Sequence, residues 1–216
     1  MPVYKLTKEL VFPPPEMANE EGLLAVGGDL SVDRLVLAYT MGIFPWYSDN
    51  YPILWWSPDP RLVILPKELK ISRSLGQTIK KGIYRITVDT AFEEVICNCA
   101  SIRRKDENST WITDDMIQAY IRLHRAGFAH SVEAWEGNEL AGGLYGVILE
   151  KAFFGESMFT RKSDASKTAF AIFAKQLAAD GFHLIDCQIS TEHMKRFGAR
   201  EVSRAKFLRL LELALT

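Results

Sequence analysis

The sequence has little of what marks secreted or membrane-spanning proteins. Only three of its 216 residues are cysteine, and this small, odd number excludes a disulfide framework and favours a reducing compartment. No apolar run approaches the roughly 18 residues that a membrane span needs, and the N-terminus lacks the basic and apolar stretches of a signal peptide. We therefore predict a cytoplasmic protein without a membrane partner, and we expect a monomer.

The sequence also has few cysteine and histidine residues at the spacing of metal ligands. Cys97 and Cys99 are separated by one residue, which is poor spacing for zinc ligands, and the four histidines lie well away along the chain. We predict no metal ion and no cofactor. Cys97, Cys99 and Cys187 are interpreted as small buried hydrophobic residues.

The chain has little excess charge of either sign. A formal net charge of −1 excludes a polyanion binder of the histone type. Basic residues are nevertheless concentrated in residues 67–81, with five against one acid, and in residues 195–209, with six against one. Such clusters either bind phosphate groups locally or form solvated helix faces.

The first 60 residues are dense in turn formers, and a single helix is predicted among them. It covers residues 32–41, with Ser31 as its N-cap and Gly42 at its end. The remaining segments (FPPPE, GIFPWYSDNYP and WWSPDPR) read as loops. We predict a small loop-rich lobe over residues 1–60 and a second domain over residues 61–216.

Regular periodicity begins near residue 83. The predicted elements are, in order, a strand, two helices, three strands of an antiparallel meander, a helix, a strand and two helices: 83–89, 91–100, 113–126, 130–136, 139–150, 152–159, 164–179, 183–189, 191–199 and 207–214. This order resembles the GCN5-related N-acetyltransferase (GNAT) fold, in which an acyl group passes to an amine. The predicted class is α+β, with a mixed, largely antiparallel sheet flanked by helices.

Common catalytic loops are missing from this scaffold. The segment TRKSDASKTAF, where such acetyltransferases cradle the pyrophosphate of coenzyme A, contains no glycine. Gly155, Glu156 and Ser157 are followed by Met158 and Phe159, so the Gly-x-Ser-x-Gly elbow is absent. An amine-acylating scaffold remains, without its usual acyl carrier.

Several sequence blocks together resemble the leucyl/phenylalanyl-tRNA-protein transferase family. They occur in order from about Phe12 to Ala199: EGLLAVGGDLS, GIFPWYS, ILWWSPDPR, TWIT, HSVEAW, GGLYGV, FFGESMF, ASKTA and LIDCQ. The resemblance implies an enzyme that moves Leu or Phe, and in some cases Met, from aminoacyl-tRNA to the N-terminal amine of proteins beginning with Arg or Lys. These proteins are thereby marked for degradation by the N-degron pathway.

The resemblance also implies where the aminoacyl-adenosine end of the tRNA binds. Trp46 and Trp111 would flank the terminal adenosine, which suits indoles because bases stack on aromatic rings whatever their sequence. Without the resemblance, Trp111 reads as core and Trp46 as a loop anchor, with Trp55 and Trp56 structural. An apolar pocket for the amino-acid side chain would be lined by Leu144, Phe153, Met158, Phe170, Phe173, Leu177 and Ile185, whose spacing alone equally fits core packing.

Glu156, Asp186 and Gln188 match the catalytic positions of the family. Asp186 and Gln188 are two apart in a strand, so their side chains are expected to share a face, and an aspartate among apolar neighbours needs a partner. We predict that Gln188 orients the attacking amine, that Asp186 holds Gln188, and that Glu156 contacts the incoming N-terminus. Two carboxylates near a cleft would favour an acceptor that begins with Arg or Lys.

Arg73, Lys80 and Lys81 are predicted to bind the tRNA backbone, because clustered cations bind phosphate without reading sequence. Two other functions remain open. One is a coenzyme A-dependent acetyltransferase, which the missing glycines oppose; the other is a non-catalytic tRNA-binding module, which the basic segments and the tryptophans would suit.

Overall fold

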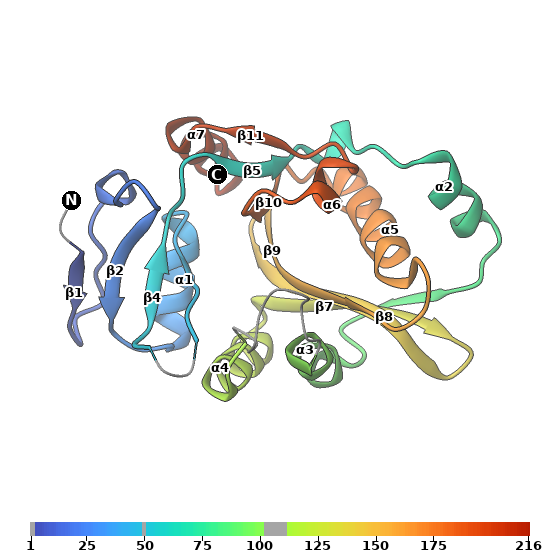
Figure 1. Ribbon diagram of the computed structural model, residues 1–216, viewed down its shortest axis with the longest axis horizontal. Helices are drawn as coiled ribbons and strands as arrows, with labels where there is room; N and C mark the ends of the chain where they lie inside the picture. The colour runs from blue at the N-terminus through green and yellow to red at the C-terminus, as the bar shows by residue number, and fades with distance from the viewer. Residues whose placement is uncertain (1–2, 49–50, 102–111) are drawn as a thin grey trace.

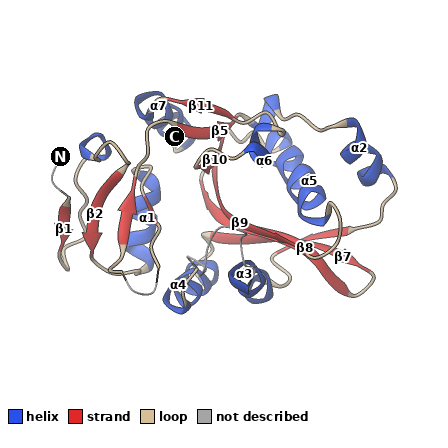
Figure 2. Ribbon diagram, in the orientation of Figure 1, coloured by secondary structure: helices blue, strands red, loops and turns tan. Residues whose placement is uncertain are grey.

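The computed structural model describes residues 3–48, 51–101 and 112–216. These residues form two β-sheets with helices around them, and Figure 1 shows the smaller sheet at the left and the larger one at the right. Helices flank the larger sheet on both faces (Figure 2). The α+β class with a mixed sheet is confirmed.

The smaller sheet was not predicted from the sequence. Its four strands pair in the order β1-β2-β4-β3, with bounds β1 Tyr4–Leu6, β2 Leu23–Gly27, β3 Phe44–Pro45 and β4 Leu54–Trp56. Strands of two to five residues between proline and glycine turns are too short to show a periodicity. The helix predicted beside them is confirmed as α1 (Val32–Thr40), whose N-cap Ser31 accepts a hydrogen bond from the Arg34 backbone N–H.

The larger sheet contains the predicted meander. Its order is β11-β5-β10-β9-β8-β7-β6, with bounds β5 Arg61–Ile64, β6 Arg85–Val88, β7 Ala129–Glu136, β8 Glu139–Leu149, β9 Ala152–Thr160, β10 Leu184–Gln188 and β11 Arg200–Val202. All neighbours pair antiparallel except β9 and β10, which are parallel. Strands β5 and β11 were not predicted.

The helices predicted after residue 83 are all present. Helices α3 and α4 cover one face of the meander and α5 covers the other, with α2 packed beside α5 (Figure 1). Their bounds are α2 Arg73–Lys80, α3 Phe92–Ser101, α4 Asp114–Arg125, α5 Ala165–Ala179, α6 Glu192–Lys195 and α7 Arg204–Ala214, with short 3-10 turns at Pro15–Met17 and Pro66–Glu68. No helix among the described residues is long and apolar enough to cross a bilayer.

Buried side chains form one cluster on each face of the larger sheet. The cluster under α3 and α4 continues into the smaller sheet and contains Trp55, while the other lies under α5. Trp55 is therefore a core residue, as predicted. Of the cysteines, Cys99 is buried and Cys187 half-buried, but the prediction for Cys97 is wrong, because it lies on the outer face of α3 and is exposed.

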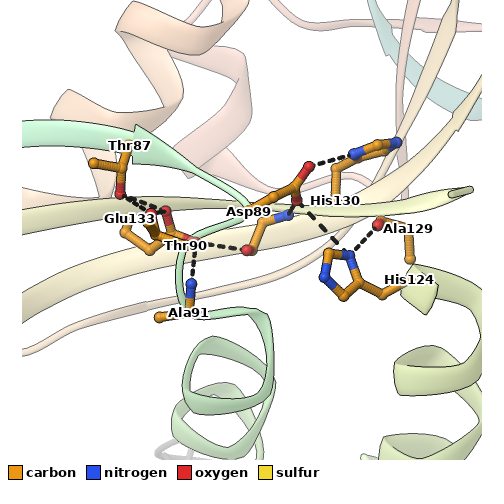
Figure 3. Close-up of polar contacts among 9 residues, drawn as sticks. Thr87, Asp89, Thr90, Ala91, His124, Ala129, His130 and Glu133 are labelled. Atoms are coloured by element: carbon orange, nitrogen blue, oxygen red, sulfur yellow. Dashed lines mark hydrogen bonds and ion pairs between the residues drawn. The ribbon is translucent and has the colours of Figure 1, made fainter.

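A polar cluster joins the end of β6 to β7 (Figure 3). Asp89, whose φ of 56° is in the left-handed region, accepts hydrogen bonds from His130 Nδ1 at 2.7 Å and from the Ser131 backbone N–H at 2.9 Å. His124 Nδ1 lies 3.8 Å from the same carboxylate. The hydrogen bond to Asp89 raises the pKa of His130, although partial burial opposes the shift. Burial would raise the pKa of Asp89, but its hydrogen bonds to His130 and Ser131 hold it below the usual value.

The His130–Asp89 pair should make stability depend on pH. A histidine whose pKa is raised on folding stabilises fully below its unfolded pKa of about 6.5, and this stabilisation is lost as pH rises through the folded value. We expect His130→Gln to lower the free energy of unfolding by up to about 1 kcal/mol at a pH of about 5.5, and by less at about 8.5. Urea denaturation at both pH values measures this. His183→Gln, at an exposed histidine, is the control, and an equal loss at both pH values would contradict the assignment.

Candidate active site

A buried ion pair joins the neighbouring strands β5 and β10 of the larger sheet. Arg61 on β5 donates from Nε to Asp186 Oδ1 at 2.8 Å and from an Nη to Oδ2 at 2.7 Å, and both side chains are fully buried. The guanidinium carbon also lies 4.7 Å from the ring centre of Phe44 and 4.5 Å from that of Phe207. The predicted need of Asp186 for a partner is thus met by a cation held between two aromatic rings.

The chain turns sharply after Asp186. The pairing with β5 is irregular between Asp186 and Gln188, and Gln188 has a φ of 60° in the left-handed region. Asp186 Oδ1 accepts the Gln188 backbone N–H at 2.9 Å, while the Gln188 side-chain amide donates to Glu156 Oε1 at 2.6 Å. Asp186 and Gln188 are therefore linked by a side-chain-to-backbone hydrogen bond and not through the shared strand face that was predicted. Asp186 holds the Gln188 backbone, and Glu156 holds its amide.

Glu156 on β9 is surrounded by donors. Besides Gln188, Tyr39 from α1 donates to Oε1 at 2.7 Å and Tyr120 from α4 to Oε2 at 3.1 Å. Burial raises the pKa of Glu156 to about 7, and the three hydrogen bonds donated to the carboxylate offset only part of this rise. At neutral pH this carboxyl group exists in both protonation states, which is the property of a group that can exchange a proton.

Glu156 and Gln188 open onto a cavity of about 400 Å³. Its apolar wall includes five of the predicted pocket residues, Leu144, Phe153, Met158, Phe170 and Ile185. Gly146 makes room for this wall, because a Cβ there would lie 2.5 Å from the Phe153 ring. The cavity therefore combines an apolar chamber with two convergent polar side chains.

Phe173 and Leu177 are buried in the cluster under α5 but are not among the cavity-lining residues. Phe173 packs edge-on against Phe153, with ring centres 5.0 Å apart, so it supports the wall from behind. Helical spacing predicted that both residues lie on the same apolar face of the helix as Phe170. Spacing alone does not show how far along that face the cavity extends. The structure adds Thr191, His193 and Met194 from the α6 region to the lining.

Asp186 does not offer a second carboxylate to the cavity. It is absent from the lining, and Arg61 occupies both of its oxygens. The prediction of two carboxylates at the cleft is therefore met by Glu156 alone, because both oxygens of Asp186 are bound to Arg61.

Trp46 also lines the cavity, on the side of the smaller sheet. Its backbone carbonyl accepts a hydrogen bond from Trp56 Nε1 at 2.7 Å, and the two ring centres are 5.7 Å apart. Trp56 thus positions Trp46. Trp111, the second tryptophan predicted to flank adenosine, lies outside the described residues.

Sequence reasoning missed three residues of this site: Arg61, Tyr39 and Tyr120. Arg61 ends the block WWSPDPR, and its place directly after a turn, among apolar residues, was the available signal. The two tyrosines belong to the apolar stripes of α1 and α4, where spacing cannot distinguish a core ring from a hydroxyl aimed at a carboxylate.

Comparison with known proteins places this geometry in a family. The model of the leucyl/phenylalanyl-tRNA protein transferase family matches residues 63–212, and that of the family's N-terminal domain matches residues 28–59. The chain belongs to this family. Relatives named leucyl/phenylalanyl-tRNA–protein transferase include those of Syntrophobacter fumaroxidans, 59% identical over 98% of this chain and 90% of the relative, and of Myxococcus xanthus, 54% identical over 100% and 93%.

Similarity to solved structures is distant. "The structure of L-PGS from Bacillus licheniformis" matches with a TM-score of 0.41 and 11% identity, over 78% of this chain and 54% of that one. Membership of the transferase family rests on the family models and relatives. It decides between the three functions that the sequence left open, in favour of an aminoacyltransferase of this type.

The transferase presents the predicted tRNA-binding residues on its surface. Arg73 and Lys80 lie on α2 and Lys81 at its end, all three exposed. The second basic segment is different, because Lys195 and Arg200 form ion pairs with acidic neighbours and Arg204 is buried. The cations of α2 are therefore more available to an external anion.

The Arg61–Asp186 pair should dominate the stability of the transferase. Removing one partner of a buried pair leaves an uncompensated buried charge, which typically costs about 3–5 kcal/mol. We expect Asp186→Asn and Arg61→Met each to lower the free energy of unfolding by that amount, and the double variant to lose less than the sum. Urea denaturation measures all three.

The control for these variants is Arg125→Ala, which breaks the exposed pair with Glu93 and should cost at most about 1 kcal/mol. Losses that simply add in the double variant would show that Arg61 and Asp186 contribute independently.

Proposed function

We propose that this enzyme moves Leu or Phe, and in some cases Met, from aminoacyl-tRNA to the N-terminal amine of proteins that begin with Arg or Lys, marking them for degradation. The observation that carries the proposal is the cavity, in which an apolar chamber ends at Glu156 and Gln188. A large apolar side chain fits the chamber. Its ester carbonyl would then lie near the polar end, where an amine could attack.

The chemistry asks little of the enzyme, since an aminoacyl ester is already activated. The protein must position the amine, remove a proton and stabilise the oxyanion. Gln188 is suited to positioning because Asp186 holds its backbone and Glu156 holds its amide. Trp46, which also lines the cavity, can stack on the terminal adenosine, and Trp111 remains a predicted partner.

Two finer assignments accompany this proposal. A GNAT-like arrangement is supported by α5, which crosses between the parallel strands β9 and β10. Preference for a cationic acceptor is supported by Glu156, whose carboxyl group reaches the cavity without a cationic partner among the described residues.

Transfer to a peptide tests the function directly. Incubated with Leu-tRNA and an Arg-initiated peptide, without coenzyme A, the wild-type enzyme should extend the peptide by one Leu, and a Glu-initiated peptide should remain unextended. Gln188→Ala should slow single-turnover transfer about 10²–10⁴-fold while leaving tRNA binding nearly unchanged. Gln176→Ala, on the exposed surface of α5, is the control. Near-normal transfer by a folded Gln188→Ala protein would remove Gln188 from the mechanism.

Cavity volume should set the amino-acid preference. Leu144→Phe adds bulk to the wall and should reduce use of Phe-tRNA more than use of Leu-tRNA, because the larger substrate side chain loses its space first. The measurement is the ratio of kcat/KM for the two charged tRNAs. Leu140→Phe adds the same bulk to the same strand, at a buried position outside the cavity lining. A ratio that changes equally in both variants would place Leu144 in ordinary core.

The exposed cations of α2 should govern the salt dependence of tRNA binding. Replacing Lys80 and Lys81 by Ala should reduce the slope of log affinity against log salt by about one for each phosphate that the variant no longer neutralises. Amino-acid preference should not change. Replacing Lys206 and Arg209, two exposed cations of α7, is the control. If the slopes of the two double variants are equal, α2 does not bind the tRNA backbone specifically.

A further inference from the structure

Three side chains with ionisable hydroxyl or carboxyl groups, from three different elements, meet behind the cavity. The carboxyl group of Glu156 is hydrogen-bonded to the Tyr39 hydroxyl at Oε1 and to the Tyr120 hydroxyl at Oε2. The two hydroxyls are also hydrogen-bonded to each other. The result is a closed triangle of three oxygen-to-oxygen contacts, in which the two tyrosines are fully buried.

Counting protons identifies which form of Glu156 fits this triangle. Each contact needs one proton between its two oxygens, so three contacts need three protons. If Glu156 is ionised, the tyrosines supply only two, and one contact is left with lone pairs facing each other. If Glu156 is protonated, the third proton is present.

The protonated form also has a consistent direction around the ring. Tyr120 donates to Oε2 when Glu156 is ionised, but in the protonated form this contact reverses and Glu156 donates from Oε2 to Tyr120. Tyr120 then donates to Tyr39, and Tyr39 donates to Oε1. Oε1 is then a carbonyl oxygen with two lone pairs, and it also accepts from the Gln188 amide. Every polar group of the triangle is satisfied, as buried groups require.

The charged surroundings do not compensate an ionised Glu156. Asp186 adds a negative charge nearby, and both oxygens of Asp186 are already bound to Arg61. On the side of α4, Tyr145 from β8 packs against Tyr120, with ring centres 5.6 Å apart. Burial raises the pKa of both Tyr39 and Tyr120 well above the usual value, so neither hydroxyl ionises in place of the carboxyl group.

We propose that Glu156 accepts the proton that the attacking amine loses, and that Tyr39 and Tyr120 hold this proton by closing the hydrogen-bonded ring. The inference rests on the proposed function, since it needs an amine that enters the cavity. Glu156 would be the catalytic residue, because its carboxyl group reaches the cavity lining. Tyr39 and Tyr120 are absent from that lining and would be positioning residues.

The proton balance of the reaction agrees with a single acceptor. An N-terminal amine with a pKa near 7.7–8.0 arrives largely as ammonium. One proton passes from it to the Glu156 carboxylate, and the nitrogen lone pair then forms the bond to the ester carbonyl carbon. As the carbon–oxygen bond to the ribose breaks, a second proton passes from nitrogen to the departing ribose oxygen. Each turnover therefore yields the extended peptide, the free tRNA and one released proton. Glu156 holds this proton until it passes to solvent.

Glu156→Gln separates proton transfer from shape. The Gln side chain can donate to Tyr120 and accept from Tyr39, so it retains the ring, but it cannot take a proton. Single-turnover transfer to an Arg-initiated peptide should fall about 10²–10⁴-fold at a pH of about 6.5. The deficit should shrink at least about tenfold by a pH of about 9, where the amine is already neutral. The melting temperature and the affinity for aminoacyl-tRNA should stay near wild type.

Tyr39→Phe and Tyr120→Phe test the ring. Each hydroxyl takes part in two hydrogen bonds of the protonated ring but donates only one to the ionised carboxylate, and its removal also relieves the contact between the two hydroxyls that lacks a proton in the ionised form. The protonated form therefore loses more, and the pKa of Glu156, followed by carbon-13 NMR of its carboxyl group, should fall. Transfer should slow about tenfold, the equivalent of one hydrogen bond. Tyr4→Phe is the control, because it removes a hydroxyl of the smaller sheet that donates to Met17, away from Glu156, and it should change neither quantity.

Two outcomes would overturn the proposal. One is a deficit of Glu156→Gln that is absent or independent of pH, and the other is a rise in the Glu156 pKa when either hydroxyl is removed, since that would mean that the tyrosines serve the ionised form. The proposed function fails separately, if the wild-type enzyme does not extend the peptide at any pH. The NMR titration needs no substrate and remains informative in that case.

Discussion

The buried pair of Arg61 and Asp186 is the constraint on which the site depends. Two desolvated charges are tolerated only when their geometry is nearly ideal, and here both carboxylate oxygens are bound while two aromatic rings enclose the cation. Because these partners come from β5, β10, β3 and α7, any displacement of one element exposes an unmet charge. The pair thereby links β3 of the smaller sheet and helix α7 to strands β5 and β10 of the larger sheet.

Asp186 and Glu156 are both removed from water, but they have different partners and therefore different roles. Asp186 is bound by a fixed cation at both oxygens, and its Oδ1 also holds the Gln188 backbone in a left-handed conformation that costs energy. Glu156 has hydrogen-bond donors but no cationic partner among the described residues, and burial raises its pKa to about 7. One carboxylate is structural, whereas the other is suited to exchanging a proton near neutral pH.

The sequence predicted the elements that have a clear period and missed those defined by long-range pairing. The meander, α3, α4 and α5 follow from alternation and helical stripes, but β5 and β11 pair with partners more than a hundred residues away or with each other. Within the site, motif blocks located Glu156, Asp186 and Gln188. Arg61 and the tyrosines could not be assigned to the site, because no local sequence pattern predicts which buried side chain will pair with a given carboxylate.

The position of Phe207 has a consequence for folding. This residue lies on α7, far from Arg61 in the sequence, yet its ring centre is 4.5 Å from the Arg61 guanidinium carbon. Until α7 has packed against β5 and β10, the cation of the buried pair lacks one of its two aromatic neighbours. Docking of α7 is therefore expected among the late steps that complete the site, because contacts between distant residues form only after the intervening chain has been closed into a loop.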